Sequence, residues 1–319
     1  MTLVIREEEV GRLLTMDDTV QAVEEAFRSQ GKGTSINRPR RRFHVPGRGN
    51  MQLMSGICHY RQAMGLKVYT SYRSGTRFMV LLFSAETGDL LAIVQADQLG
   101  RMRTGAASGV ATKYLANEGA KVVGMIGSGG QAATQLEAVC AVRRIEQARV
   151  YSRRPEPLAA FCDGMSKKLG IAVSPAPTAE DAVAGADVVV TITNARDPVL
   201  RGEWIAQGAH VNAAGSNSLV RRELDGDAIR RSDVITVDSR EQARIECGDL
   251  LAAAERGAVH WETLTELGDV VSGKAVGRTS ETQVTLFESQ GLAIQDVSTA
   301  MKVYELARQE GLGQEIDVF

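Results

Sequence analysis

The feature that most restricts the fold is a regular alternation of buried strands and helices that begins at Ala120. A strand-like run, AKVVGMIG, leads into a glycine-rich turn and a helix. Further strand-like runs follow, with helical stretches such as PEPLAAFCDGMSKKLG and AEDAVAGA between them: ARVYSR, IAVSPAP, DVVVTIT, AHVNAAG and DVITVD. Such alternation, bounded by Gly and Pro, is typical of a parallel sheet covered on both faces. We therefore predict an α/β, Rossmann-type, doubly wound domain over residues 118–295.

The residues before this domain follow a different pattern, with strand runs that succeed one another directly. NMQLMSG, AMGLKVYTSY, RFMVLLFSA and LLAIVQAD are such runs, and ETGD before the last of them indicates a hairpin turn. A strand over TLVI and a helix over MDDTVQAVEEAFRSQGKG come first, and a helix over TGAASGVATKYLANEG closes the region. We predict a sheet-rich α+β domain for substrate binding and dimerisation from residues 1–117 together with 296–319. An amphipathic helix is predicted over LAIQDVSTAMKVYELARQEG and ends at Gly311.

Composition excludes several classes of protein. The 37 Lys and Arg residues and 39 Asp and Glu residues give a net charge of −2, which lacks the broad positive field of a nucleic-acid binder. The four cysteines show no CxxC spacing and the four histidines are scattered, so we expect no disulfide framework and no metal site. The apolar run Phe78 to Phe83 is too short to span a membrane. The first residues soon become acidic and resemble no secretory signal, so a cytoplasmic location is expected.

The turn after the first strand of the α/β region carries a dinucleotide fingerprint. GMIGSGGQA contains G-x-G-x-x-A at Gly127, Gly129 and Ala132, directly after a strand and at the start of a helix. Gly127 permits the tight turn, Gly129 lets the backbone approach a pyrophosphate, and Ala132 keeps the helix close to the sheet. A turn that only reverses the chain is the alternative. The predicted cofactor contacts here are Gly127, Ser128, Gly129, Gly130, Gln131 and Ala132.

The end of the second strand bears on which dinucleotide binds. NAD-binding domains usually place Asp or Glu there, whereas this chain has Ser152, Arg153 and Arg154. Two guanidinium groups can hold a 2′-phosphate, so NADP(H) is favoured and NAD(H) remains possible if these arginines only coat the adenine pocket. At the end of a later strand, Thr191, Thr193 and Asn194 are further predicted cofactor contacts.

Several segments together resemble the ornithine cyclodeaminase/mu-crystallin family. They are RPRRRF, MGLKVYT, RMRTGAASGVATKYLA, GMIGSGGQA, PVLRGEWIAQGAHVNAAGSN and FESQGLAIQD, in order and spread over nearly the whole chain. The family includes cyclodeaminases, alanine dehydrogenases and ketimine reductases that use NAD(H) or NADP(H). The resemblance implies a homodimer formed through the sheet-rich domain, with the active site between the two domains. It also implies cofactor-side roles for Asp296 and, more weakly, Ser289; Asp296 could instead be only a helix N-terminal acid.

The resemblance further implies a substrate-carboxylate clamp formed by Arg41, Lys67 and Arg103. Strand alternation supports it by placing Gly65, Lys67, Tyr69 and Ser71 on one polar face. Arg103 is expected at a helix N-terminus, where a cation opposes the helix dipole unless an anion neutralises it. The alternatives are a solvated lysine and a surface arginine. The neighbouring Arg38, Arg40 and Arg42 are expected in solvent or at a subunit interface, and a second substrate carboxylate could recruit Arg40, Arg73 or Arg77.

One departure from the family pattern bears on the chemistry. Cyclodeaminases carry a catalytic Asp in a GGD turn, where this chain has NAAGSN with Asn217. An amide has no useful acid–base pKa. The hypothesis is therefore a reductase of a small α-imino acid or an amino-acid dehydrogenase. Arg41 and Arg103 bind the substrate carboxylate, Lys67 adds charge and a proton, Asn217 orients the imine nitrogen, and hydride from NAD(P)H reaches the imine carbon.

Two other functions stay open from the sequence. One is an ornithine cyclodeaminase-type lyase that forms proline and ammonia, and the other is a non-catalytic, NADP-binding crystallin-like protein. The substrate side chain is not fixed either. A pyruvate-derived imine, iminosuccinate and cyclic imines such as pyrroline-2-carboxylate are all candidates.

Overall fold

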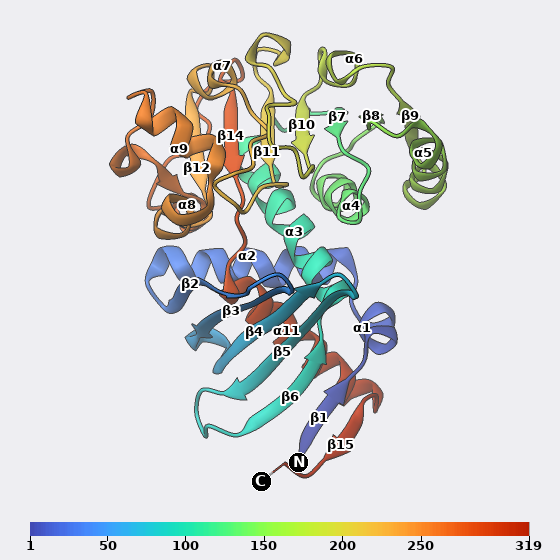
Figure 1. The fold of residues 1–319 in the computed structure, drawn as a ribbon, viewed down its shortest axis with the longest axis vertical. Coiled ribbons are helices and arrows are strands. Elements are labelled where there is room, and N and C mark those ends of the chain that lie inside the picture. The colour runs from blue at the N-terminus through green and yellow to red at the C-terminus, as the bar shows by residue number, and fades with distance from the viewer. Residues whose placement is uncertain (319) are drawn as a thin grey trace. The chain divides into compact units, whose positions relative to one another are not determined.

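The computed structural model describes residues 1–318, whose contacts divide the chain into two compact units (Figure 1). Unit 1 comprises Met1–Arg103 and the segment that starts at Leu292, and unit 2 comprises Thr104–Gly291. The sequence prediction placed these divisions at 117/118 and 295/296. The first division falls inside one continuous helix, α3 (Asp97–Leu115), so no loop marks it in the sequence. Along residues 1–318, no helix combines the length and apolar composition that a membrane span requires.

Unit 1 is built on a mixed sheet with the strand order β15-β1-β6-β5-β4-β3-β2. All neighbouring strands pair antiparallel except β1 and β6, which pair parallel. The bounds are β1 (Thr2–Ile5), β2 (Ser35–Val45), β3 (Gly49–Cys58), β4 (Ala63–Tyr72), β5 (Gly75–Ser84), β6 (Leu90–Gln95) and β15 (Gln314–Ile316). The sheet-rich prediction is confirmed, and the arginine-rich stretch proves to be a strand, β2.

The two long helices of unit 1 end at glycine, and one of them, α2, begins at a side-chain cap. They are α1 (Glu7–Leu13), α2 (Met16–Lys32), the one-turn 3-10 helix His59–Arg61, and α11 (Ala293–Glu310). The Thr15 side chain accepts from the backbone N–H of Asp18, and α2 ends at Gly33 in the left-handed region. Helix α11 ends at Gly311 in the same way, as the sequence predicts. It packs on β3 and β4, and α2 packs against it (Figure 1).

Helix α3 starts seven residues earlier than the sequence predicts. Its first turn is capped from a distant segment, because the Glu7 carboxylate accepts from the backbone N–H groups of Asp97 at 2.6 Å and Gln98 at 3.0 Å. Arg103 therefore lies in the second turn and not at the helix N-terminus. The expectation that Arg103 opposes the helix dipole there is wrong, because the dipole effect is confined to the first turn.

The two faces of the unit 1 sheet differ in their surroundings. The face that carries Gly65 and Lys67 packs against α11: Ile294 lies against Gly56, and Val297 lies against Gly65. The opposite face carries polar residues, among them Arg41 and Arg77, and apolar side chains, several of which are exposed: Ile36, Phe43, Met51 and Met79. Strand register brings Leu53, Val68 and Met79 side by side on that face. The sheet therefore presents an uncovered apolar face within unit 1.

Unit 2 contains a fully parallel sheet with the order β13-β12-β14-β11-β10-β7-β8-β9. Alternate residues of β10 pack into two separate cores: Val188 and Val190 lie in one, and Val189 lies in the other. The sheet is thus buried on both faces, which confirms the doubly wound prediction. Strand order reverses between β7 and β10, the place where such sheets bind dinucleotides. The bounds are β7 (Val122–Ile126), β8 (Gln147–Tyr151), β9 (Ala172–Pro175), β10 (Val188–Thr191), β11 (His210–Ala213), β12 (Val234–Val237), β13 (Thr265–Glu266) and β14 (Thr285–Glu288).

Short helices connect these strands. They are α4 (Ala132–Val142), α5 (Pro155–Leu169), α6 (Ala179–Val183), α7 (Gly226–Arg230), α8 (Arg240–Glu246), α9 (Gly248–Glu255) and α10 (Leu267–Val271), with 3-10 turns at Gly202–Trp204 and Trp261–Thr263. Helices α4 to α6 fall where the sequence predicts them. The segment from α7 to β14 holds several elements that the sequence prediction did not resolve, because they are only two to eight residues long.

Candidate functional site

A cavity of about 870 Å³ lies in unit 2 at the carboxyl ends of β7 and β10. Ten of the predicted cofactor contacts line it: Gly127, Ser128, Gly129, Gly130, Gln131, Ser152, Arg153, Arg154, Thr193 and Asn194. Further lining comes from the loop that follows Asn194 and from Ala214 and Gly215, which the sequence prediction did not include. The cavity therefore joins the glycine turn to the ends of β8, β10 and β11.

The glycine turn has the geometry that a pyrophosphate requires. Gly127 has φ +114°, and a Cβ there would lie 2.4 Å from the Ile192 carbonyl oxygen, so only glycine fits. A Cβ at Gly129 would meet no atom within 4 Å, so the backbone is open on that side. Helix α4 begins at Ala132, which is fully buried, and its N-terminal turn provides the positive end of a helix dipole. These residues fit a bound dinucleotide.

Four other predicted cofactor contacts lie elsewhere. Ala132 and Thr191 are buried beneath the cavity wall and do not line it. Ser289 follows β14 and is 4% exposed, also outside the lining. Asp296 belongs to unit 1, where it forms buried ion pairs. Each of these side chains is enclosed by protein, and direct contacts from these residues to a cofactor stay a prediction.

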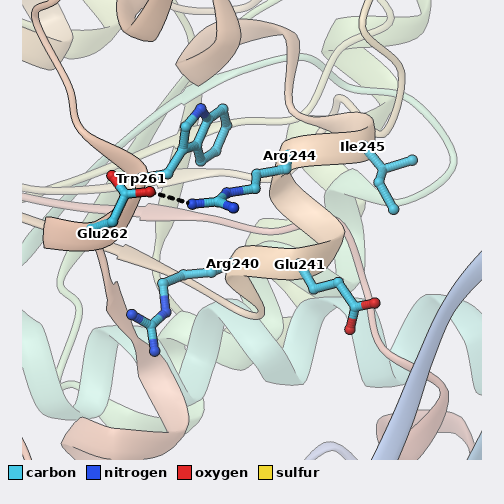
Figure 2. A pocket seen from close by; sticks show the side chains of 6 residues that line it. All are labelled: Arg240, Glu241, Arg244, Ile245, Trp261 and Glu262. Atoms are coloured by element: carbon cyan, nitrogen blue, oxygen red, sulfur yellow. Dashed lines mark hydrogen bonds and ion pairs between the residues drawn. The ribbon is translucent and has the colours of Figure 1, made fainter.

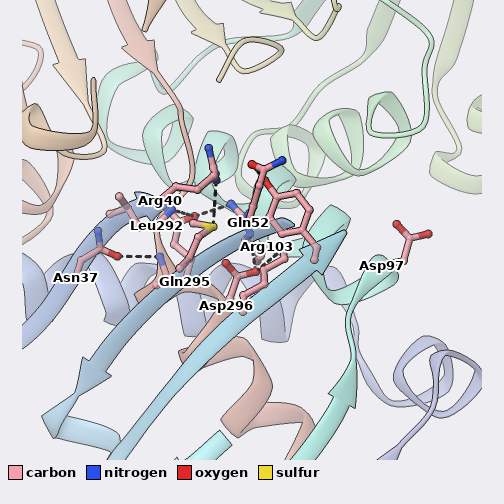
Figure 3. Close-up of polar contacts among 12 residues, drawn as sticks. Asn37, Arg40, Gln52, Asp97, Arg103, Leu292, Gln295 and Asp296 are labelled. Carbon is pink, nitrogen blue, oxygen red and sulfur yellow. Dashed lines mark hydrogen bonds and ion pairs between the residues drawn. The ribbon is translucent and has the colours of Figure 1, made fainter. Parts of the chain in front are cut away.

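The sheet face of unit 1 that packs on α11 carries a buried ionic cluster (Figure 3). The Lys67 ammonium donates to Asp296 Oδ1 at 2.8 Å, and Arg103 Nε donates to the same oxygen at 3.0 Å. Arg103 Nη1 donates to Gln295 Oε1 at 3.0 Å. Lys67, Arg103 and Asp296 are 3%, 6% and 0% exposed. Two of the three predicted clamp residues, Lys67 on β4 and Arg103 on α3, thus lie together beside Asp296 on α11.

The third cationic side chain at this cluster is Arg40, whose charge acts on Lys67, and not Arg41. The pairing of β2 with β3 shifts register between Arg38 and Arg41, at Pro39, which cannot donate to the strand ladder. As a result Arg40 is 6% exposed and contacts Met54, the residue that pairs with Lys67 on β4, whereas Arg41 is exposed and pairs with Leu53. Figure 3 shows Arg40 near Arg103 and Gln52. Arg41 lies on the face opposite Lys67 because simple alternation does not hold across the bulge, and its role in a substrate clamp stays a prediction.

The cluster holds an excess of positive charge. Lys67 and Arg103 carry two positive charges, and the one carboxylate that they share, Asp296, carries a single negative charge. Burial lowers the pKa of Lys67 to about 8, with Arg103 and Arg40 acting in the same direction and Asp296 opposing them. Burial raises the pKa of Asp296, but Arg103 and Lys67 outweigh it and hold this carboxyl below its usual value of 3.8. A buried site of this charge favours an anionic ligand.

Polar and aromatic groups extend the cluster along the same sheet face. The rings of Tyr69 and Phe78 are 5.0 Å apart, and the Lys67 ammonium lies 5.3 Å from the Phe78 centroid. Gln52 Oε1 accepts from the Tyr69 hydroxyl at 2.5 Å and from Arg42 Nε at 3.2 Å. The predicted polar face of Gly65, Lys67, Tyr69 and Ser71 is thus present, with an aromatic wall beside the lysine.

Asn217 lies in unit 2, four residues beyond the end of β11. It is partly buried, and no carboxylate takes its place in the turn Gly215–Ser218. Within residues 1–318, no group of three or more His, Cys, Asp or Glu side chains is arranged to hold a metal ion.

A second cavity, of about 440 Å³, opens beside α8 in unit 2 (Figure 2). Its charged groups pair with one another: Arg244 donates to Glu262 at 2.7 Å and also lies over the Trp261 ring at 5.9 Å. Arg240 lies 3.7 Å from Glu266. These arginines are therefore neutralised locally, and the cavity lacks the buried charge excess of the Lys67 cluster.

Comparison with known proteins gives consistent matches along the chain. The model of the ornithine cyclodeaminase/mu-crystallin family matches residues 1–311. Alanine dehydrogenase of Archaeoglobus fulgidus is 36% identical over 326 residues, which cover 100% of this chain and 99% of the relative. The structure of Thermococcus litoralis Delta(1)-pyrroline-2-carboxylate reductase in complex with NADH and L-proline matches with a TM-score of 0.94 at 36% identity, over 99% of this chain and 100% of that one. An archaeal alanine dehydrogenase dimer with bound NAD matches with a TM-score of 0.93 at 36% identity, over 100% and 99%.

The family match spans both the β2–β4 segment that carries the ionic cluster and the glycine turn of the dinucleotide cavity. Since it also includes all of α11, where Asp296 lies, every element of the two sites falls within it. On this sequence-wide match and the agreement of the fold, the chain belongs to the ornithine cyclodeaminase/mu-crystallin family.

Proposed function

We propose that this protein is an NAD(P)H-dependent reductase that converts a small α-imino acid into the corresponding amino acid. The observation that carries the proposal is the buried pair of Lys67 and Arg103 on one carboxylate, Asp296, in a chain that also holds a cavity suited to a dinucleotide. Relatives that share about a third of its residues are alanine dehydrogenases and pyrroline-2-carboxylate reductases. The proposal assigns the substrate carboxylate to the cluster and the dinucleotide to the cavity.

The side chains of this chain supply binding and proton transfer. Arg40 and Arg103 bind the substrate carboxylate, because a guanidinium forms paired, charge-assisted hydrogen bonds with it. Lys67 is protonated below about pH 8 and is the proton donor to the imine nitrogen. Asn217 orients that nitrogen by hydrogen bonding, since an amide does not exchange protons. A bound NAD(P)H supplies the hydride that reaches the imine carbon.

The test of this function separates it from cyclodeamination. The purified protein is mixed with NADPH or NADH and a panel of imino acids: keto acids with ammonia or methylamine, and cyclic imines. A reductase oxidises one NAD(P)H for each amino acid formed. A cyclodeaminase instead releases ammonia from L-ornithine with no net change in cofactor absorbance. The proposal fails if ornithine is consumed in this way, or if the protein binds dinucleotide and reduces no member of the panel.

We further propose a preference for NADP(H) over NAD(H). Strand β8 is followed by Ser152, Arg153 and Arg154, which line the cavity and offer no carboxylate to the ribose hydroxyls. Both arginines are exposed, so they are free to reach a 2′-phosphate. Solved relatives of this family contain NAD or NADH, so the preference rests on these residues alone.

Replacing both arginines with alanine is expected to raise the Kd for NADPH by about ten- to a hundred-fold, since each lost charge-assisted contact costs about 1.5–3 kcal/mol before solvent screening. The Kd for NADH is expected to change less than about two-fold. Fluorescence titration of each nucleotide measures both values. Arg196→Ala, a change at another cavity-lining arginine, is the control. Equal loss of NADPH and NADH affinity in the double variant would remove the basis for the preference.

We also propose that the protein is a homodimer formed through the apolar face of the unit 1 sheet. Ile36, Phe43, Met51 and Met79 are 36–49% exposed on that face, which is an unusual concentration of large apolar groups. A second copy of the same face is the partner of matching chemistry, because a two-fold interface pairs identical patches. An archaeal relative is described as a dimer.

Met79→Lys, at the middle of that face, is expected to convert the dimer into monomers because it buries an unpaired charge in the interface. Sedimentation velocity measures the change in mass. Val276→Lys introduces the same charge at a position that is 74% exposed in unit 2, and this control is expected to stay dimeric. A dimeric Met79→Lys protein would place the interface elsewhere.

A further inference from the structure

The Glu223 carboxylate lies beneath the dinucleotide cavity and is fully buried. It accepts four hydrogen bonds: from the Thr193 backbone N–H at 2.6 Å, the Thr193 hydroxyl at 2.7 Å, the Gly215 backbone N–H at 2.8 Å and the Thr191 hydroxyl at 3.0 Å. Two of these bonds reach Oε1 and two reach Oε2. Glu223 does not line the cavity, so it does not touch a ligand there.

These four bonds join the two loops that form one wall of the cavity. Thr193 follows β10 and Gly215 follows β11, and both line the cavity. The loops are in direct contact, because a Cβ at Gly215 would lie 2.3 Å from the Thr193 backbone nitrogen and oxygen and 2.6 Å from Glu223 Oε1. The first loop also meets the glycine turn, since the Ile192 carbonyl lies against Gly127. A single side chain thus joins two segments that line the cavity, and one of these packs against the glycine turn.

A second buried carboxylate fixes the backbone of Glu223. Asp249, in the first turn of α9, accepts from the backbone N–H groups of Glu223 and Leu224 at 2.8 Å each. Burial raises the pKa of Asp249 to about 7, and the Glu223 charge contributes in the same direction. Burial also raises the pKa of Glu223, although its bonds to Thr193, Gly215 and Thr191 oppose that effect. The two backbone N–H donors, Thr193 at one oxygen and Gly215 at the other, require an acceptor at both oxygens.

We propose that Glu223 is a positioning residue for the dinucleotide: its carboxylate holds the β10 and β11 loops in the arrangement that the cofactor binds. This rests on the proposed function only in taking the cavity as the dinucleotide site. An amide at this position cannot reproduce the contacts, because its NH₂ group would face either the Gly215 or the Thr193 N–H, donor against donor. The proposed role therefore requires a carboxylate, and glutamine, which has the same shape, does not fulfil it.

Glu223→Gln is expected to raise the Kd for NAD(P)H at least about ten-fold, measured by fluorescence titration without substrate. At saturating cofactor, the KM for the imino acid is expected to change less than about two-fold. Glu246→Gln is the matched control: Glu246 is 1% exposed in the same unit, and its side chain accepts from Gln242. That control is expected to keep the wild-type Kd even where it lowers the melting temperature.

A pair of substitutions at Thr191 provides a test that does not require Glu223→Gln to fold. Thr191 is 0% exposed and lies outside the cavity lining, and its hydroxyl donates to Glu223 Oε2. Thr191→Val removes the hydroxyl and is expected to raise the Kd about three- to ten-fold, whereas Thr191→Ser keeps the hydroxyl and the wild-type Kd. Folded Thr191→Val and Glu223→Gln proteins with wild-type Kd values would overturn the inference. A wild-type protein that binds no dinucleotide would instead overturn the proposed function.

Discussion

Replacing Lys67 with methionine is expected to lower kcat/KM for imino-acid reduction by about 10³-fold, because the change removes both a charge of the carboxylate clamp and the proton donor. The Kd for NAD(P)H is expected to stay within about two-fold of the wild-type value, since Lys67 belongs to unit 1 and the dinucleotide cavity lies in unit 2. Steady-state kinetics and nucleotide titration measure the two quantities. Lys32→Met, at an exposed position in unit 1, is expected to retain full activity. A fully active Lys67→Met protein would show that the cluster is not the catalytic site.

The same residue predicts the pH dependence of the reaction. The pKa of Lys67 is about 8 in the folded protein, below its usual value of 10.5. Because the donor must be protonated, kcat/KM is expected to fall as the pH rises through about 8. The free energy of unfolding changes in the opposite direction. Below pH 8 the buried, charged lysine lowers it. Between pH 8 and 10.5 it rises, because the folded protein has lost this charge. A bound substrate carboxylate reduces the cost, so substrate is expected to protect the protein most at neutral pH.

Asp296→Asn is expected to lower the free energy of unfolding by about 3–5 kcal/mol at neutral pH, because it leaves Lys67 and Arg103 buried without their shared counterion. The pKa of Asp296 lies below its usual 3.8, so its contribution is present above that pH and is lost as the pH falls through the lower, folded-state value. The difference between wild type and variant should therefore shrink in acid. Urea unfolding at pH 7 and at pH 3 measures it.

The control for this prediction lies on the same helix. Glu310→Gln neutralises an exposed carboxylate at the end of α11 and is expected to change stability by less than about 0.5 kcal/mol. The loss of Asp296 should also move the decline in kcat/KM to lower pH, because Asp296 raises the pKa of Lys67. An Asp296→Asn protein with wild-type stability and an unchanged pH profile would show that Asp296 is not the counterion of Lys67.

Local sequence signals predicted the regular elements well. Helix α2 begins after Thr15 and ends at Gly33 because cap and stop lie within the helix's own sequence. The start of α3 was missed because its first turn is capped by Glu7, ninety residues earlier. Strand β2 was missed because its outward positions carry arginines in place of the alternating apolar residues that mark a half-buried strand.

In the candidate site, too, the residues set by local sequence were predictable and those set by distant contacts were not. The glycine turn was predictable because the motif and its geometry occupy consecutive residues. Arg41 was chosen over Arg40 because the register shift at Pro39 depends on pairing with β3 and is invisible to alternation. Asp296 was placed beside the cofactor, yet it pairs with Lys67 and Arg103, which are about two hundred residues away in the chain. Glu223 gave no local signal at all, since each of its partners belongs to another segment.

Transfer of the cofactor hydrogen into the product tests the central claim most directly. NAD(P)H labelled with deuterium at C4, on each face in turn, is incubated with the protein and the best imino acid of the panel. The account predicts that one of the two labelled cofactors yields an amino acid with a single deuterium on the α-carbon, with one cofactor oxidised for each product. An amino acid without deuterium from either cofactor would contradict it.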